Sequence, residues 1–282
     1  MPRLCSLCAL LILASTATHS AEKTGDDYLT RMQREHAADT PIASAATKTE
    51  PASEVSSKDV DYVDIDGDTV AGYLATPTEG KPRAGIIVIH EWWGLNDNIR
   101  AMAERLAGEG YAALAVDLYE GEVAETREDA LRLARGTSDK APRLEQNLRG
   151  AWTFLKKDPG VAKVGVIGWC FGGGWSLRTA LLLGDDIDAT VIYYGRLATD
   201  RKTLEALDSP VLGLFGALDE GIPVTTVREF QGTLDSLGKN ASIHIYEDAH
   251  HAFANPSGTR YNEGAATDAW AKTLAFYGEN LR

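Results

Sequence analysis

The stretch Lys163-Val-Gly-Val-Ile-Gly168-Trp169-Cys170-Phe171-Gly172-Gly173-Gly174 decides the fold of this chain. An apolar run typical of a buried strand leads into a short turn at Cys170, and a glycine-rich helix start follows. Glycines stand two residues before and two residues after Cys170, as required where a strand and the next helix pass closely. The pattern predicts a cysteine held at a sharp turn between a buried strand and a helix.

Strands and helices alternate on both sides of this turn. Residues 60–65 and 69–75 alternate polar and apolar positions around Asp66-Gly67-Asp68, which indicates a hairpin. Residues 84–90 form an almost continuous apolar run, as in a buried parallel strand. Further strands are predicted at 111–118, 163–168, 189–194, 211–216 and 243–246, and helices from 99, from 142, and at 172–183, 224–237 and 268–281. This order predicts an α/β fold with a mostly parallel central sheet, helices on both faces, and one domain over residues 59–282.

Composition and charge exclude several classes of protein. The chain has 282 residues, of which 44% are hydrophobic and 24% charged, the usual mix for a globular protein. A formal net charge of −13 argues against a nucleic-acid partner, which needs a basic face. A disordered chain, a collagen and a coiled coil are also excluded.

The N-terminus predicts export. Met1-Pro2-Arg3 is followed by an uncharged apolar run to Ala14 and then by small residues, which is typical of a signal peptide over residues 1–20. The alternative is an ordinary terminus with a chance apolar run. We expect a periplasmic or secreted protein with no membrane segment after cleavage. Residues 21–58 are polar and predict a poorly ordered lead-in, with a short helix near 28–36.

Export leaves Cys170 as the one thiol of the mature chain, because Cys5 and Cys8 lie in the predicted signal. A buried cysteine that packs as a small hydrophobe is one interpretation. A nucleophile is the other, because the turn matches the strand–nucleophile–helix arrangement of α/β-hydrolases and the helix N-terminus favours a thiolate.

A cysteine nucleophile needs a base and an acid that orients the base. In this fold they follow the nucleophile in the order acid, then histidine, each on a loop after a late strand. Asp219 fits the acid; Glu220 is the nearby competitor, and a helix cap is the structural alternative for Asp219. His250 and His251 both fit the base, and the residues themselves do not choose between them.

The loop after the strand at 84–90 supplies the remaining candidates. An oxyanion hole in this fold uses the backbone N–H after the nucleophile, here Phe171, and one from an early loop, here Trp92. Glu91 ends a buried strand, where a carboxylate needs a partner, and the Cys170 thiol is the nearest reactive one.

The chain resembles the dienelactone hydrolase family of α/β-hydrolases over about residues 60–282. Four stretches carry the resemblance: His90-Glu91-Trp92-Trp93-Gly94-Leu95-Asn96, Gly165 to Gly173 around Cys170, Phe215-Gly216-Ala217-Leu218-Asp219, and Tyr246-Glu247-Asp248-Ala249-His250-His251-Ala252-Phe253. The resemblance implies a Cys170, Asp219 and His251 triad, since the family's histidine lies two residues before a phenylalanine. It also implies that Glu91 contacts the resting thiol and helps to deprotonate it.

Substrate binding is where the chain departs from the family. Members that open dienelactone hold its carboxylate with arginines; Arg127, Arg132 or Arg135 could match one of them, whereas Asn255 stands at the position of the other. An uncharged amide cannot form the bidentate ion pair with a carboxylate that an arginine forms.

The sequence therefore predicts a hydrolase of carboxylic esters or lactones, with a small-molecule substrate. No cofactor or metal site is expected from the spacing of the histidines. The alternatives are a non-catalytic or thiol-redox protein that kept the fold, and a binding module with a decayed turn. The sequence does not indicate the oligomeric state.

Overall fold

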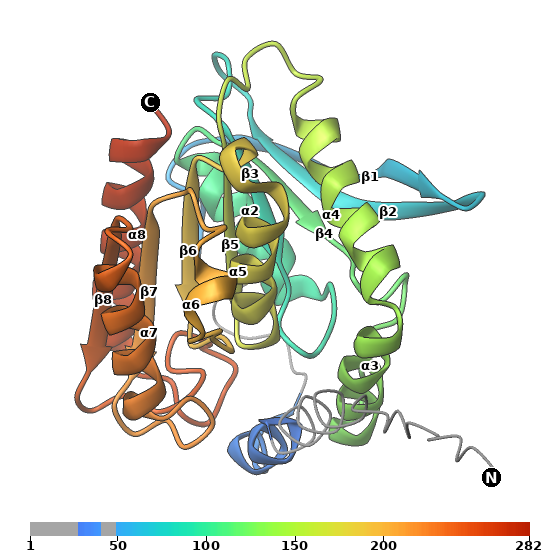
Figure 1. Ribbon diagram of the computed structural model, residues 1–282. Coiled ribbons are helices and arrows are strands. Elements are labelled where there is room, and N and C mark those ends of the chain that lie inside the picture. The colour runs from blue at the N-terminus through green and yellow to red at the C-terminus, as the bar shows by residue number, and fades with distance from the viewer. Residues whose placement is uncertain (1–27, 41–48) are drawn as a thin grey trace, which may run out of the picture.

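The computed structural model of the chain describes residues 28–40 and 49–282 (Figure 1). The predicted signal peptide over residues 1–20 lies outside these residues.

An eight-stranded sheet forms the centre of the molecule, in the order β1-β2-β4-β3-β5-β6-β7-β8. The pairs β1–β2 and β2–β4 are antiparallel, and every other neighbouring pair is parallel. The strands are β1 (Val55–Ile65), β2 (Asp68–Pro77), β3 (Gly85–Ile89), β4 (Ala112–Val116), β5 (Val164–Trp169), β6 (Ala189–Tyr193), β7 (Val211–Gly216) and β8 (Ala241–Tyr246). The predicted α/β fold and its mostly parallel sheet are confirmed.

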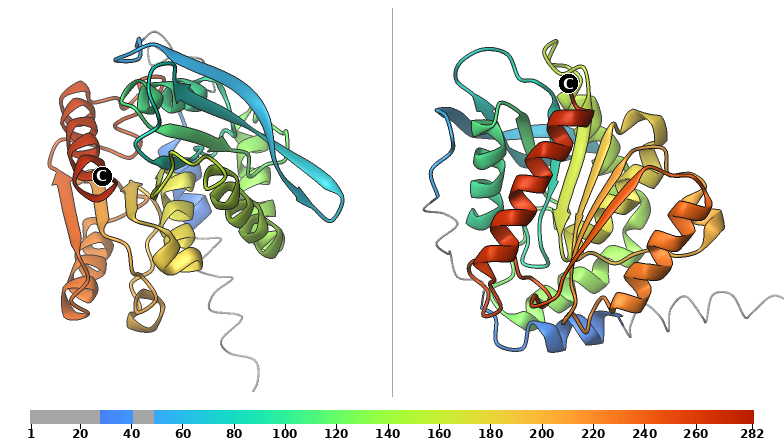
Figure 2. Two further views of the ribbon diagram at one scale, coloured as in Figure 1. Left: turned by 90° about the horizontal axis from the view of Figure 1, so that it is seen from above. Right: turned by 90° about the vertical axis from the view of Figure 1, so that its left-hand side faces the viewer.

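Helices cover both faces of the sheet (Figure 2). The helices α2 (Asp97–Gly108) and α8 (Glu263–Asn280) lie on one face, and α4 (Ala141–Leu155), α5 (Phe171–Leu183) and α7 (Val224–Ser236) on the other. The helix α3 (Arg127–Asp139), the short α6 (Arg201–Leu204) and the 3₁₀ turn η2 (Gly184–Asp186) complete the chain. Because the parallel strands run in one direction, their carboxyl ends and the loops that follow them share one edge of the sheet.

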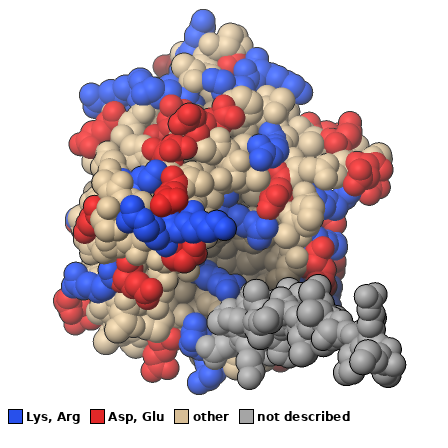
Figure 3. All heavy atoms as spheres, viewed as in Figure 1, with Lys and Arg blue, Asp and Glu red and all other residues tan. Residues whose placement is uncertain are grey.

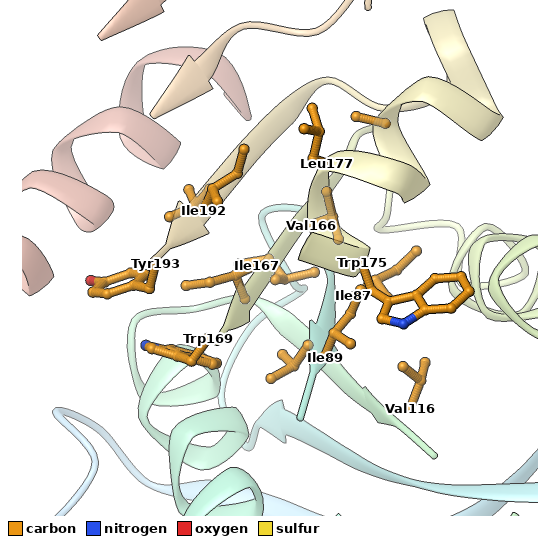
Figure 4. Close-up of a cluster of buried hydrophobic side chains, with 14 of the residues drawn as sticks. Ile87, Ile89, Val116, Val166, Ile167, Trp169, Trp175, Leu177, Ile192 and Tyr193 are labelled. Atoms are coloured by element: carbon orange, nitrogen blue, oxygen red, sulfur yellow. The ribbon is translucent and has the colours of Figure 1, made fainter. Parts of the chain in front are cut away.

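The inner strands are buried on both faces, which explains their unbroken apolar runs. All residues of β3, β4, β5, β6 and β7 are buried. Figure 4 shows side chains of these strands packed with Trp175 and Leu177 of α5. Burial between two helix layers therefore anchors β5, the strand that carries Cys170 on its end.

The N-terminal region differs from the predicted lead-in over residues 21–58. Residues 28–35 are helical, as the short local pattern predicted, but this helix is packed: Tyr28 and Met32, four residues apart, are both buried in the core. The first strand begins at Val55 rather than near 59, because its residues 56–59 are exposed edge positions with polar side chains. The range of the predicted lead-in therefore contains a packed helix at residues 28–35 and the first residues of β1.

On the face of the molecule shown in Figure 3, neither positive nor negative charge dominates. Acidic and basic side chains alternate over the face shown in Figure 3. Among the described residues, every helix is too short or too polar to cross a lipid bilayer.

Replacing Gly168 with alanine tests the close packing of the turn. A Cβ at Gly168 would lie 2.1 Å from the carbonyl oxygen of Gly172, and backbone cannot move aside cheaply. We expect Gly168→Ala to lower the free energy of unfolding by about 3 kcal/mol or more. The matched control is Gly136→Ala in α3, where a Cβ meets nothing within 4 Å. This control should gain about 0.5–1 kcal/mol. Urea unfolding measures both, and a Gly168→Ala protein as stable as the parent would contradict the packing.

Candidate active site

Cys170 occupies a strained turn between β5 and α5. Its φ of +54° lies in the left-handed region, which a non-glycine residue adopts at a cost of about 1–3 kcal/mol. Its backbone N–H donates to the carbonyl of Tyr193, 3.0 Å away. Only 1% of the side chain is exposed. The surrounding strands thus hold the sulfur in one position at the carboxyl edge of the sheet.

His251 and Asp219 come together on the loops after β8 and β7. The Nδ1 atom of His251 lies 2.7 Å from Oδ2 of Asp219, and both side chains are fully buried. The other carboxylate oxygen accepts from the backbone N–H groups of Gly221 and Ile222 at 2.7 and 2.8 Å. Asp219 therefore orients His251 and is itself held by a tight turn.

Burial distinguishes the two candidate bases, and likewise the two candidate acids, between which the sequence left the choice open. His250 and Glu220 are exposed, whereas His251 and Asp219 are buried at the turn. The choice of His251 over His250, and of Asp219 over Glu220, agrees with this arrangement.

The charges of Cys170 and His251 favour an ion pair. Burial alone would raise the pKa of the Cys170 thiol, but the nearby imidazoles of His251 and His36 outweigh it and lower that pKa to about 6. Burial alone would lower the pKa of His251, but the charges of Asp219 and Cys170 raise it well above its usual range. The side chains can therefore supply a thiolate and a proton donor at neutral pH.

Glu91 lies at the predicted place, beyond the end of β3, but its hydrogen bond joins a different partner. Its Oε2 accepts from Nδ2 of Asn255 at 2.6 Å, and its Oε1 is buried with no hydrogen-bond partner among the described residues. Burial, together with the charge of Cys170, raises the pKa of Glu91 to about 8. The carboxyl group is therefore mostly protonated at neutral pH, and Asn255 positions it.

The two predicted oxyanion donors flank this region. Phe171 is the first residue of α5, where backbone N–H groups have no partner within the helix. Trp92 lies in the turn that follows β3, and its ring stacks on the imidazole of His36 with a centroid separation of 4.4 Å.

Sequence reasoning missed His36. Its Nε2 lies 3.5 Å from the Cys170 sulfur, and its Nδ1 lies 2.8 Å from Oδ2 of Asp39. Burial alone would lower the pKa of His36, but the hydrogen bonds to Asp39 and Cys170 raise it above its usual value. The only sequence signal was a His-x-x-Asp spacing at the end of a short helix, which by itself is weak.

His36 belongs to a segment that covers the thiol, residues 28–40, which we call the strap. Figures 1 and 2 show its helix, in blue, across the carboxyl edge of the sheet. Its polar anchors are Asp39, which accepts from the backbone N–H and hydroxyl of Thr259, and Glu35, which accepts from the backbone N–H of Glu220 and pairs with Arg260. The strap thus covers the site at the carboxyl edge of the sheet.

The predicted substrate-binding arginine Arg127 contacts the strap. Its guanidinium donates to the carbonyl of Ala37. Arg132 pairs with Glu122, 2.8 Å away, on the surface. A role for Arg127 in substrate binding stays a prediction.

A cavity of about 430 Å³ adjoins the turn. Residues of the strap and of α5 line it, among them Tyr28, Leu29, Phe171 and Trp175, together with Arg196 from the segment after β6. The cavity is large enough for a small molecule.

The chain is similar in sequence and in fold to known proteins. The model of the dienelactone hydrolase family matches residues 70–281. "Protein usf" of Aquifex pyrophilus is 34% identical over 222 residues, which cover 76% of this chain and 95% of that one. A Saccharolobus solfataricus protein, whose name proposes a carboxymethylenebutenolidase, is 31% identical and covers 76% of this chain and 96% of its own. A Klebsiella pneumoniae crystal structure, described as a proposed dienelactone hydrolase, has a TM-score of 0.72 and 27% identity, over 80% of this chain and 99% of that one.

The ionisation of Cys170 tests the electrostatics of the site. We expect the ultraviolet absorbance of the thiolate to appear with a midpoint near pH 6, below the ordinary value of 9.0, because protonated imidazoles stabilise the negative charge. His36→Asn should raise the midpoint, since one hydrogen-bond partner and its charge are lost. Cys170→Ser gives the baseline. A midpoint near that of a free thiol in the parent protein would contradict the geometry.

Proposed function

The chain belongs to the dienelactone hydrolase family, and we propose that it hydrolyses a carboxylic ester or lactone through a thioester on Cys170. One observation carries the proposal: the buried imidazole of His251, oriented by Asp219, has a ring nitrogen within 4.8 Å of the sulfur of Cys170, which sits on a strained strand–helix turn. This is the geometry that nucleophilic acyl transfer requires.

The reaction proceeds in two halves. The Cys170 thiolate adds to the substrate carbonyl, and the negative charge moves onto the carbonyl oxygen, next to the N–H groups of Trp92 and Phe171. The carbonyl re-forms, the C–O bond breaks, and protonated His251 gives its proton to the leaving alkoxide. A water then loses a proton to His251 and adds to the thioester, which releases the acid and restores the thiol. Each donor of an oxyanion hole contributes about 3 kcal/mol of transition-state stabilisation.

We propose that Glu91 supports the thiolate without forming a bond to the substrate. A carboxyl group with a pKa of about 8 holds a proton at neutral pH, so it adds no second negative charge beside the thiolate. Its hydrogen bond to Asn255 keeps it within the electrostatic reach of Cys170. A protonated carboxyl group cannot accept the thiol proton, so we propose that His251 takes that proton and that neutral Glu91 leaves the thiolate without a negative neighbour.

The substrate we propose is an uncharged ester or lactone. The Asn255 amide donates a hydrogen bond to Glu91 and, being uncharged, cannot form a bidentate ion pair with a substrate carboxylate. The guanidinium of Arg127 donates a hydrogen bond to the strap. Because Cys170 is 1% exposed and His251 fully buried, substrate reaches the sulfur only when the strap moves. The cavity of about 430 Å³ that Phe171 lines offers space for an acyl or alcohol group.

Variants of Cys170 and His251 test the mechanism. We expect Cys170→Ala and His251→Asn to lower kcat/KM for reactive esters and lactones by at least about 10³-fold, because each removes a group that acts in both halves. His250→Asn, at the exposed neighbouring position, should keep the parent rate. Mass spectrometry of the parent protein after a brief incubation should show the acyl group on Cys170.

Two outcomes would overturn the mechanism. Parent-level turnover in Cys170→Ala excludes the thioester. Alkylation of Cys170 in a protein without turnover of any ester favours the thiol-redox alternative.

We also propose that the chain is exported, on the basis of its basic start and its apolar run of signal-peptide length. Expressed in a Gram-negative host, the full chain should yield a periplasmic or secreted protein that starts after Ala17 or Ser20. N-terminal sequencing of that fraction tests the prediction, and an intact N-terminus in the cytosol would contradict it.

A further inference from the structure

Three buried side chains bring potential metal-ligand atoms close together. The sulfur of Cys170 and ring nitrogens of His36 and His251 all lie within 4.8 Å of one another. The distance from Sγ of Cys170 to Nε2 of His36 is 3.5 Å. In a tetrahedral zinc site, with Zn–S about 2.3 Å and Zn–N about 2.0 Å, a sulfur and a nitrogen ligand lie about 3.5 Å apart.

Each of the two imidazoles has a carboxylate on one ring nitrogen, as histidine metal ligands usually have. The Nδ1 atom of His36 is hydrogen-bonded to Asp39 and that of His251 to Asp219, which leaves both Nε2 atoms for the centre. Histidines that bind zinc usually have this support from a carboxylate on the other ring nitrogen. The Nε2 of His251 is buried and has no hydrogen-bond partner among the described residues.

Hydrolysis accounts for only one of these two histidine–carboxylate pairs. The triad uses His251 and Asp219, whereas His36 and Asp39 reach the same sulfur from the strap. Spacing along the chain could not reveal the cluster, because His36 and Cys170 lie 134 residues apart.

We propose that Cys170, His36 and His251 bind one Zn²⁺ ion, with water at the fourth position, and that the bound ion switches the enzyme off. A thiolate and two imidazoles suit zinc, whereas Mg²⁺ and Ca²⁺ prefer oxygen ligands. Binding forms one Zn–S and two Zn–N bonds; the thiol proton, and any proton on the two Nε2 atoms, leave to solvent.

Inhibition follows from the ligand set and rests on the proposed function. The ion takes the sulfur electron pair that would attack a carbonyl and the Nε2 of His251 that would carry the proton. It also ties His36, and with it the strap, onto the thiol. The strap must open for zinc to enter, because Cys170 and His251 are buried.

Zinc binding is measured directly, without any substrate. The full mature chain competes for Zn²⁺ with a chromogenic chelator, and we expect one ion per chain. His36→Asn should weaken binding at least about 100-fold, and Asp39→Asn, which keeps the imidazole but loses its orientation, about 10- to 100-fold. His250→Asn, an exposed histidine next to the cluster, is the matched control and should bind as the parent does. Circular dichroism checks that each variant is folded.

Absorption spectroscopy of the cobalt-substituted protein identifies the ligands. Co²⁺ in place of zinc should give tetrahedral visible bands and a thiolate-to-cobalt band in the near ultraviolet, and Cys170→Ser should lose the latter. If ester turnover is found, Zn²⁺ should abolish it, a chelator should restore it, and His36→Asn should need a higher zinc concentration for the same inhibition.

The results separate this site from the proposed hydrolysis. Tight zinc binding that depends on His36 supports the site even if no ester is turned over. Equal affinity in the parent, His36→Asn and Asp39→Asn overturns it and leaves His36 as a ring that packs on Trp92. Zinc inhibition that is unchanged in His36→Asn also overturns the three-ligand site, because the ion would then bind elsewhere or to Cys170 and His251 alone.

Discussion

The close approach of β5, α5 and the end of β3 is the constraint on which the site depends. A Cβ at Gly168 would lie 2.1 Å from the Gly172 oxygen, and one at Gly172 would lie 2.3 Å from the oxygen of Ile89. The chain between these glycines must therefore turn at one residue, and Cys170 takes the left-handed conformation that results. The strain persists because the strands on both sides are completely buried and cannot relax around it. The position of the sulfur is thus set by backbone packing.

Two histidine–carboxylate pairs meet at this sulfur, but different segments of the chain hold them in place. Asp219 is held by backbone N–H groups of its own loop, next to the strand β7, so its pair with His251 belongs to the rigid frame. Asp39 is held by Thr259 and Arg260 from a loop far along the chain, so its pair with His36 belongs to a segment that is attached by polar contacts. The strap adds the buried side chains of Tyr28 and Met32 to these contacts, which is less apolar burial than that of the completely buried inner strands. The frame and the strap can therefore have different stabilities in one molecule.

Local patterns were enough to predict the sheet and the turn at Cys170, because buried strands need unbroken apolar runs and close crossings need glycine. The sequences of the loops after β7 and β8 reduced the candidates for the catalytic acid and base to two neighbouring residues each. His250 and His251 could not be separated, because adjacent loop residues differ in the direction that the backbone gives them. The resemblance to a family made that choice, and the burial of His251 agrees with it.

The strap and the environment of Glu91 were beyond such reasoning. Few apolar residues mark the strap, and His36 acquires meaning only through Cys170, 134 residues away. The partner of Glu91 was likewise hidden: Asn255 was considered for its inability to bind a carboxylate substrate, yet its amide donates to a carboxyl group of the protein itself. Both contacts join segments that approach only in the finished fold.

The attachment of the strap has a consequence for how the molecule is made. The strap leaves the ribosome early, but Thr259 and Arg260, to which it is anchored, are synthesised more than 200 residues later. Domains fold as their chain emerges, and contacts between distant segments form late. The strap therefore reaches its anchors only after the last strand of the sheet, β8 (Ala241–Tyr246), has also been made, so the oldest part of the described chain is fixed in place by one of the youngest.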